Sequence, residues 1–266
     1  MVLILWAIGA GLFIMLATGL IPAATEQSSQ VIAQSPPTIA LPATPTIVWP
    51  ATWTPPPTPT KTVQNTPLLY LTPPAESCYV ETAADMGNMR YALDCELTAL
   101  WYLLQTHPRY QDRVARDALY SSIVYHENPN KGFRGDMRGP RPGNSDLNYG
   151  MHARALADAG QRIGVPMQVI RSVYEMKQHL CRGEPVIAWM RSAQGRGRHL
   201  LVQSYQDAEG APYYTVAYEH AVLVTGYDGE KIWYRDPSNG RLFTMGWRLF
   251  ENEILLFDKQ MTAIRK

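Results

Sequence analysis

Residues 94–104 of the chain read DCELTALWYLL. Four apolar residues recur there at the i, i+3, i+4 and i+7 spacing that gives a helix one apolar face: Leu97, Leu100, Trp101 and Leu104. Asp94 precedes them and is a residue type favoured at an N-cap. The pattern therefore predicts a helix that begins at Cys95 and packs one face against a hydrophobic core.

The place of Cys95 in the first helical turn has chemical consequences. The thiolate is the nucleophilic form of cysteine, and the N-terminus of a helix offers unsatisfied N–H groups and about half a positive charge. These groups favour the thiolate, so we expect a lowered pKa for Cys95, and they can also stabilise an oxyanion. The segment is also compatible with a cysteine that is only a small buried hydrophobic residue.

A second informative stretch, residues 218–237, reads YEHAVLVTGYDGEKIWYRDP. Two β-forming runs flank the Asp-Gly pair at 228–229, which is a strong hairpin signal. A two-residue loop would set His220 opposite Pro237, whereas a three-residue loop with the glycine in the left-handed conformation sets it opposite Asp236. The second register pairs apolar residues on one face, so we predict it. An aspartate beside a histidine can hold the ring in one tautomer and stabilise the imidazolium.

Taken together, these motifs resemble those of the bacteriocin-processing (double-glycine leader) cysteine peptidases, and more closely their stand-alone extracytoplasmic relatives. The shared features are a Cys-Glu pair at a helix start, a late strand with Glu-His-Ala-Val, a Gly-Tyr-Asp turn and an Asp-Pro-x-x-Gly strand end. Residues 128–136 are similar to a loop of those relatives, and residues 183–189 to their strand before the catalytic histidine. The likeness spans about residues 88–240.

The resemblance implies an α+β fold of the papain-like cysteine peptidase type, with an N-terminal catalytic helix packed on an antiparallel β-sheet. It also implies that Cys95 is the nucleophile, His220 the general base and then acid, and Asp236 the residue that orients the imidazole. The implied activity is hydrolysis of a peptide or amide bond through an acyl-enzyme thioester.

One position departs from the family pattern. The family carries a glutamine about six residues before the cysteine, which helps to stabilise the oxyanion, but position 89 is Met in this chain. Asn88 is the nearest amide that could replace it, so we assign Asn88 as the oxyanion donor. Losing one such donor typically costs about 10²–10³ in rate, so the departure predicts weakened rather than absent catalysis.

The N-terminal quarter of the chain differs in composition from the rest. Residues 1–24 contain an uncharged apolar stretch of a length that can span a bilayer, which predicts a membrane anchor helix or a cleaved signal peptide. Residues 25–75 are rich in proline and threonine and predict a disordered linker. Residues 76–266 remain as the papain-like domain. A stalk of this kind suits an extracytoplasmic domain, either membrane-anchored or secreted.

Charge and cysteine content exclude several other classes. The formal net charge is +1 and no Lys/Arg-rich run occurs, so nucleic acid is not an expected partner. The three cysteines form no CxxC pair, so we expect no cysteine-based zinc site and no cofactor. Cys78 and Cys181 could form a disulfide in an oxidising compartment, which would leave Cys95 free.

Two other functions stay open at this point. The chain could be a binding module that keeps the fold without turnover, as the missing glutamine suggests. It could also be a peptidoglycan amide hydrolase, since those enzymes carry a cysteine followed by a histidine in the same order. The leading hypothesis is a cysteine peptidase whose partner is a peptide or protein substrate, with membrane attachment through residues 1–24 if they are not cleaved.

Overall fold

The computed structural model describes residues 75–83, 86–139 and 148–265. Its helices are α1 (Cys95–Thr106), α2 (Arg116–Ser121), α3 (Ala153–Arg162), α4 (Val173–Cys181), α5 (Ala193–Arg196) and α6 (Trp247–Leu255). Its strands are β1 (Cys78–Tyr79), β2 (Met167–Ile170), β3 (Val186–Arg191), β4 (Val202–Gln206), β5 (Pro212–Val216), β6 (Glu219–Tyr227), β7 (Lys231–Arg235), β8 (Leu242–Gly246) and β9 (Met261–Ile264). The predicted anchor or signal at 1–24 and the linker up to residue 74 lie outside the described residues.

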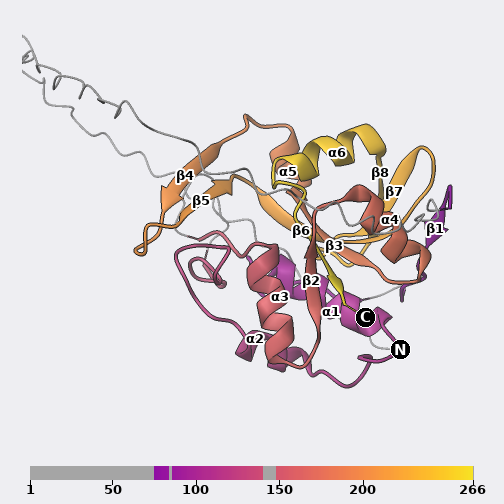
Figure 1. The fold of residues 1–266 in the computed structure, drawn as a ribbon, viewed down its shortest axis with the longest axis horizontal. Helices are drawn as coiled ribbons and strands as arrows, with labels where there is room; N and C mark the ends of the chain where they lie inside the picture. The colour runs from indigo at the N-terminus through magenta and orange to yellow at the C-terminus, as the bar shows by residue number, and fades with distance from the viewer. Residues whose placement is uncertain (1–74, 84–85, 140–147, 266) are drawn as a thin grey trace, which may run out of the picture. The chain divides into compact units, whose positions relative to one another are not determined.

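A single antiparallel sheet forms the centre of the described fold. Its strands follow the order β2-β9-β3-β6-β7-β8, and β1 pairs with the far end of β6. Strands β4 and β5 form a separate two-stranded ribbon, which extends away from the sheet (Figure 1). The strand expected at 183–189 is β3, and its register with β6 sets Met190 beside His220.

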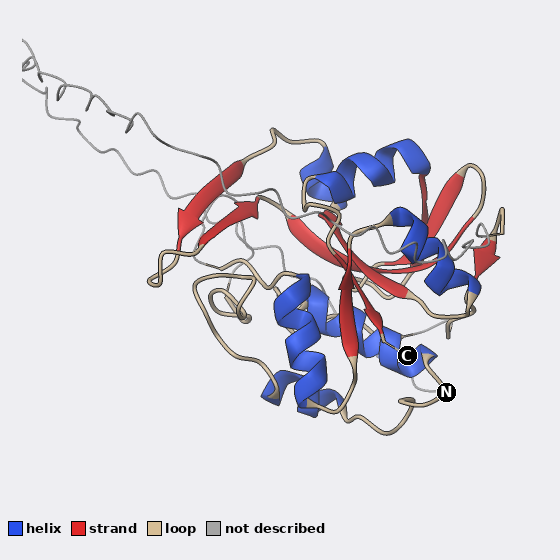
Figure 2. Cartoon of the chain, in the orientation of Figure 1, coloured by secondary structure: helices blue, strands red, loops and turns tan. Residues whose placement is uncertain are grey.

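Helices cover both faces of this sheet (Figure 2). Helices α1 and α3 pack on one face, where α1 contacts β3 and β6. Helices α4 and α6 pack on the other. Alternation along β6 separates the two cores, because Ala221 and Leu223 belong to the core with α1, and Val222 and Val224 to the other. The predicted α+β fold with an N-terminal helix packed on an antiparallel sheet is confirmed.

Helix α1 begins at Cys95, as the sequence predicts, and ends before His107-Pro108, because proline disfavours helical backbone in the residue before it. Its burial differs from the prediction. Trp101, expected on the apolar face, is only half-buried, whereas Glu96 and Thr98 are fully buried. The reason is that α1 also contacts α2 and α3, so its other side is covered as well.

The β6–β7 hairpin has a register that neither predicted loop would give. Asp228 N donates to Lys231 O at 2.9 Å, so the turn consists of Gly229 and Glu230. The pairing then shifts by one residue at a β-bulge between Val224 and Gly226. The predicted pairing of His220 directly opposite Asp236 is therefore wrong.

The bulge nevertheless puts Asp236 on the same face of the sheet as His220, as the prediction required. With this turn and no bulge, Asp236 would fall opposite Leu223, on the face away from His220. With the bulge, Leu223 pairs with Arg235, and the next pair in this register sets Asp236 opposite Val222. His220 and Asp236 are then diagonal neighbours on one face of the sheet.

A disulfide joins Cys78 in β1 to Cys181 at the end of α4, and Cys95 is the free cysteine. The bridge spans 103 residues of sequence. Because a cross-link over a loop of this length restricts the unfolded chain, replacing both cysteines by serine should lower the free energy of unfolding by about 2–5 kcal/mol. Urea denaturation of the full chain measures this. A midpoint equal to that of the wild type would contradict the prediction, and a reductant should lower the midpoint of the wild type alone.

Within the described ranges, no helix combines the length and apolar character needed to cross a bilayer.

Candidate active site

Cys95 lies at the point where the β7 ladder ends. The β6–β7 pairing stops at Leu223, and beyond that end the amide of Ala221 donates to Cys95 Sγ at 3.4 Å. The thiol thus takes the place that a β7 residue would occupy beside β6. The donating N–H belongs to the peptide unit between His220 and Ala221. Helix α1 and strand β6 therefore bring the predicted nucleophile to the backbone of the predicted base.

His220 and Asp236 are in direct contact. His220 Nε2 lies 2.8 Å from Asp236 Oδ1, and the His220 side chain is 8% exposed. Burial alone would raise the pKa of Asp236, but the hydrogen bond and charge of His220 and the hydrogen bonds from Ser238 hold that pKa well below its usual range. Asp236 is therefore ionised near neutral pH and can fix the orientation of the ring.

The thiol reaches the strand that carries the imidazole through the backbone of β6, at the Ala221 amide. Cys95 packs in the core on the α1 side with Ala221, whereas His220 precedes Ala221 on β6 and alternates to the other face. Among the described residues, the hydrogen-bond partners of the thiol are Glu96 and the Ala221 amide. The structure thus joins His220 to Asp236 directly and brings Cys95 to the amide of the next residue, Ala221.

Asp94 occupies the predicted N-cap position of α1 but does not cap the helix with its side chain. Its Oδ2 instead accepts hydrogen bonds from Arg90 N at 3.0 Å, from Tyr91 N and from the Tyr120 hydroxyl. These hydrogen bonds to the Asp94 carboxylate stabilise the turn before the helix. The first N–H groups of α1 are left without a bond from this carboxylate.

Asn88 lies in the segment that packs against the turn after β7. Met89 N donates to Pro237 O at 3.0 Å, which fixes this contact. With its amide turned so that nitrogen faces acceptors, Asn88 donates to Gly87 O at 3.1 Å and Asn239 O at 3.2 Å. These carbonyl groups satisfy the amide nitrogen, and the role of Asn88 as an oxyanion donor remains a prediction.

The electrostatics of the thiol differ from the expectation of a lowered pKa. Burial raises the pKa of Cys95 well above its usual range, and the neighbouring carboxyl groups of Glu96 and Glu219 raise it further. The hydrogen bond from Ala221 opposes these effects but is outweighed. In the absence of substrate the sulfur is therefore protonated.

Sequence reasoning missed both glutamates. Glu96 was visible only as the acid of a Cys-Glu pair, and Glu219 only as the residue before His220. A signal was present, because both acids stand inside runs that are otherwise apolar. Buried acids in such runs are uncommon and usually have a specific partner.

One set of donors in the described part of the chain is close enough to hold a metal ion. It consists of Cys95 Sγ and one oxygen each of Glu96 and Glu219, which all lie within 4.8 Å of one another. A cation there would have to displace the thiol proton. Glu96 Oε1 also already accepts a hydrogen bond from Met151 N at 2.6 Å. We therefore interpret the cluster as three groups that share and exchange protons.

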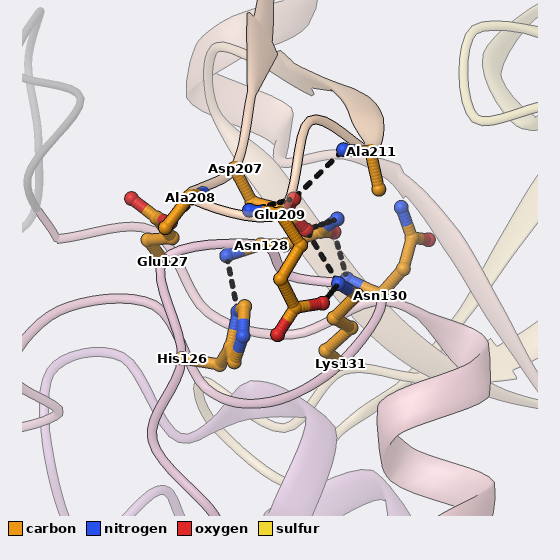
Figure 3. A network of polar contacts seen from close by, with 9 residues as sticks. All are labelled: His126, Glu127, Asn128, Asn130, Lys131, Asp207, Ala208, Glu209 and Ala211. Atoms are coloured by element: carbon orange, nitrogen blue, oxygen red, sulfur yellow. Dashed lines mark hydrogen bonds and ion pairs between the residues drawn. The ribbon is translucent and has the colours of Figure 1, made fainter.

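The loop at 128–136, singled out in the sequence, anchors the β4–β5 ribbon (Figure 3). Asn128 Nδ2 donates to Asp207 Oδ2 at 2.9 Å, and Lys131 Nζ lies 2.7 Å from the same carboxylate. The hydrogen bonds from Lys131 and then Asn128 hold the pKa of Asp207 well below its usual range. The loop also reaches the core, because His152 N donates to Pro129 O at 2.8 Å.

This network continues toward the thiol. The Tyr149 hydroxyl lies 3.1 Å from His152 Nε2 and accepts a hydrogen bond from Val216 N, at the end of β5. Two residues after Tyr149, the amide of Met151 binds Glu96. The loop thus supports the segment that faces the candidate site.

A helix with cysteine at its N-terminus, packed on an antiparallel sheet that carries a His-Asp pair, defines the class of papain-like cysteine peptidases. The sequence profile of the Peptidase_C39-like family matches residues 86–253, and the chain belongs to that family. It is a cysteine-type peptidase, and its substrates are peptides or proteins.

A solved structure of a similar protein agrees on the fold. A C39-like peptidase from Bacillus anthracis is 20% identical to this chain, with a TM-score of 0.58 over 72% of this chain and 98% of that one. Xylellain, a cysteine protease from Xylella fastidiosa, is 14% identical, with a TM-score of 0.38 over 73% of this chain and 90% of its own. No curated protein matches the chain.

Proposed function

We propose that the protein hydrolyses peptide or amide bonds with Cys95 as nucleophile, His220 as general base and then acid, and Asp236 as the residue that orients the imidazole. One observation carries the proposal. The Cys95 sulfur lies 3.4 Å from the amide that follows His220, and the imidazole is itself bound to Asp236 at 2.8 Å.

The first half of the reaction forms a thioester. Asp236 binds Nε2, so Nδ1 of His220 is the nitrogen that can accept the thiol proton. As the proton moves to Nδ1, the sulfur forms a bond to the substrate carbonyl carbon and the carbonyl π electrons move to oxygen. The oxyanion then re-forms the carbonyl, the C–N bond breaks, and the imidazolium gives its proton to the departing amine.

The second half releases the acid. Water attacks the thioester carbon while His220 accepts one of its protons, and a second oxyanion forms. Its collapse breaks the C–S bond, and the proton returns from the imidazolium to sulfur. The N–H groups at the start of α1 are the proposed oxyanion donors, and the Asn88 amide would join them by exchanging a hydrogen bond to Gly87 or Asn239 for one to the oxyanion.

The raised pKa of Cys95 bears on when the proton moves. Because the buried thiol is protonated without substrate, we infer that proton transfer to His220 accompanies attack. The charged imidazolium then lies beside ionised Asp236, which favours this step.

Substrate class is the open part of the proposal, and the full chain can be tested for it directly. Incubation with a peptide library followed by mass spectrometry should show new termini with the wild type and none with Cys95→Ala. Turnover of peptidoglycan fragments but not of peptides would select an amide hydrolase of the cell wall. Absence of turnover on both would favour the binding module that the methionine at position 89 suggests.

We further propose that the domain works outside the cytoplasm, anchored or secreted through residues 1–24 and held on the 25–75 linker. The Cys78–Cys181 disulfide supports this, because structural disulfides persist in oxidising compartments. Nucleic acid has no part in the proposal.

A further inference from the structure

Two carboxyl groups flank Cys95 and have no part in the mechanism above. Glu96 follows Cys95 in α1 and is fully buried, and Glu219 precedes His220 in β6. Cys95 Sγ lies 3.3 Å from Glu96 Oε2, and the three groups lie within 4.8 Å of one another. Helix α1 and strand β6 thus gather a thiol and two acids in one place.

Two carboxyl groups this close in a buried site cannot both be ionised. Glu96 Oε1 accepts the 2.6 Å hydrogen bond from Met151 N, which favours its charged form. Glu219 Oε1 is buried and has no hydrogen-bond partner in the described part of the chain, so a charge on it is disfavoured. Glu219 is therefore the acid that keeps its proton.

The pKa values of the two acids follow this division. Burial is the main cause that raises the pKa of Glu96, to about 7, against the opposing hydrogen bond from Met151. Burial, and then the charge of Glu96, raise the pKa of Glu219 well above its usual range. Glu96 thus changes charge near neutral pH, beside the sulfur.

The groups that face the pair from other elements do not neutralise it. Asp94, before α1, adds to the raised pKa of Glu96. Tyr149 faces the pair from the segment before α3, and burial raises its pKa so that it stays neutral. His220 follows Glu219 in β6 and is bound to Asp236, the residue after β7. Among the described residues, no lysine or arginine forms an ion pair with either glutamate.

We propose that Glu96 is a positioning residue that, held beside protonated Glu219, controls how readily Cys95 loses its proton and restricts full activity to the acidic side of neutrality. This rests on the proposed function. With Glu96 protonated, the sulfur has a neutral neighbour and its proton can pass to His220. Once Glu96 is ionised, its negative charge opposes the developing thiolate.

The test compares the full-length wild type with Glu96→Gln and a matched control, Glu219→Gln. Glutamine keeps the oxygen that accepts from Met151, removes the charge, and replaces the oxygen next to the thiol by an NH2 group. A single ionisation near pH 7 should lower wild-type kcat/KM about fivefold between pH 7 and pH 8. Glu96→Gln should lose less than about twofold over that interval, and Glu219→Gln should keep the decline because Glu96 is still present.

A second measurement does not need turnover. Since Cys78 and Cys181 are joined, thiolate absorbance at 240 nm reports Cys95 alone, with Cys95→Ser as the blank. Glu96→Gln should show about tenfold more thiolate than the wild type at pH 8. If the wild type has no activity, the proposed function fails, while this titration still decides the role of Glu96. Equal thiolate in the two proteins, or a decline in kcat/KM that is unchanged in Glu96→Gln with normal circular dichroism, would overturn the inference.

Discussion

Replacing Cys95 by alanine should lower kcat/KM for peptide hydrolysis by about 10⁶-fold, the loss typical when a triad nucleophile is removed. The physical reason is that no other group at the site can form the covalent bond to the carbonyl carbon. The free thiol is also unique, because the remaining two cysteines are paired in a disulfide. Steady-state kinetics with a fluorogenic peptide from the library screen measures the effect.

The fold should survive this change, because Cys95 is a small residue in the core with Ala221 and alanine removes only one atom. Thermal unfolding of the variant, followed by circular dichroism, serves as the control. Cys95→Ser should be nearly as inactive as Cys95→Ala, since a buried hydroxyl is a far poorer nucleophile than a thiolate. Hydrolysis by folded Cys95→Ala within a hundredfold of the wild type would contradict the assignment.

The second large effect is expected at Asp236. Asp236→Ala should lower kcat by about 10⁴-fold, because His220 would lose the partner that orients its ring and stabilises the imidazolium. Asp236→Asn should lose a similar amount, because its neutral amide cannot stabilise the imidazolium and its NH2 group can hold the ring in the wrong tautomer. A comparable loss in both variants would show that the carboxylate charge is needed, and not only a polar partner for the ring.

Asp228→Asn is the matched control for this series. Asp228 follows β6 as Asp236 follows β7, and it also accepts hydrogen bonds from the backbone, those of Glu230 and Lys231 at 2.8 Å. It lies at the opposite end of the hairpin, so its replacement should leave kcat within about twofold of the wild type. An equal loss in Asp228→Asn and Asp236→Asn would show that hairpin stability, rather than contact with His220, explains the result.

Much of this site could be predicted from local pattern. The start of α1 at Cys95 follows from the residue before it and the apolar spacing after it. The existence of the β6–β7 hairpin follows from β-rich runs around an Asp-Gly pair. Both are short-range features, which the periodicity of apolar residues predicts directly.

The predicted register of the β6–β7 hairpin and the predicted lowered pKa of Cys95 were wrong, and both features depend on tertiary packing. The bulge forms where β1 lies against β6, and a Cβ at Gly226 would come within 2.8 Å of Cys78 O. Period-2 reasoning assumes a regular strand, so it could not place this extra residue. The predicted contact survived because the bulge and the true turn together preserve the face of Asp236.

The protonation of the thiol could not be predicted for a similar reason. The helix N-terminus alone favours a lowered pKa. Glu219, however, is 124 residues after Cys95 in the sequence and lies close to the thiol only in the folded chain. Burial, then the charges of Glu96 and Glu219, raise the pKa of Cys95 against the hydrogen bond from Ala221. The charge state of Cys95 is therefore a property of the assembled site.

The proposed proximity of Cys95 and His220 can be tested with 1,3-dibromoacetone, whose two reactive carbons bridge a sulfur and a ring nitrogen only when both are within reach of one short linker. Peptide mapping of the full chain after reaction should find a cross-link between Cys95 and His220 in the wild type and none in His220→Ala. Alkylation of Cys95 without any bridge to His220 would contradict the account.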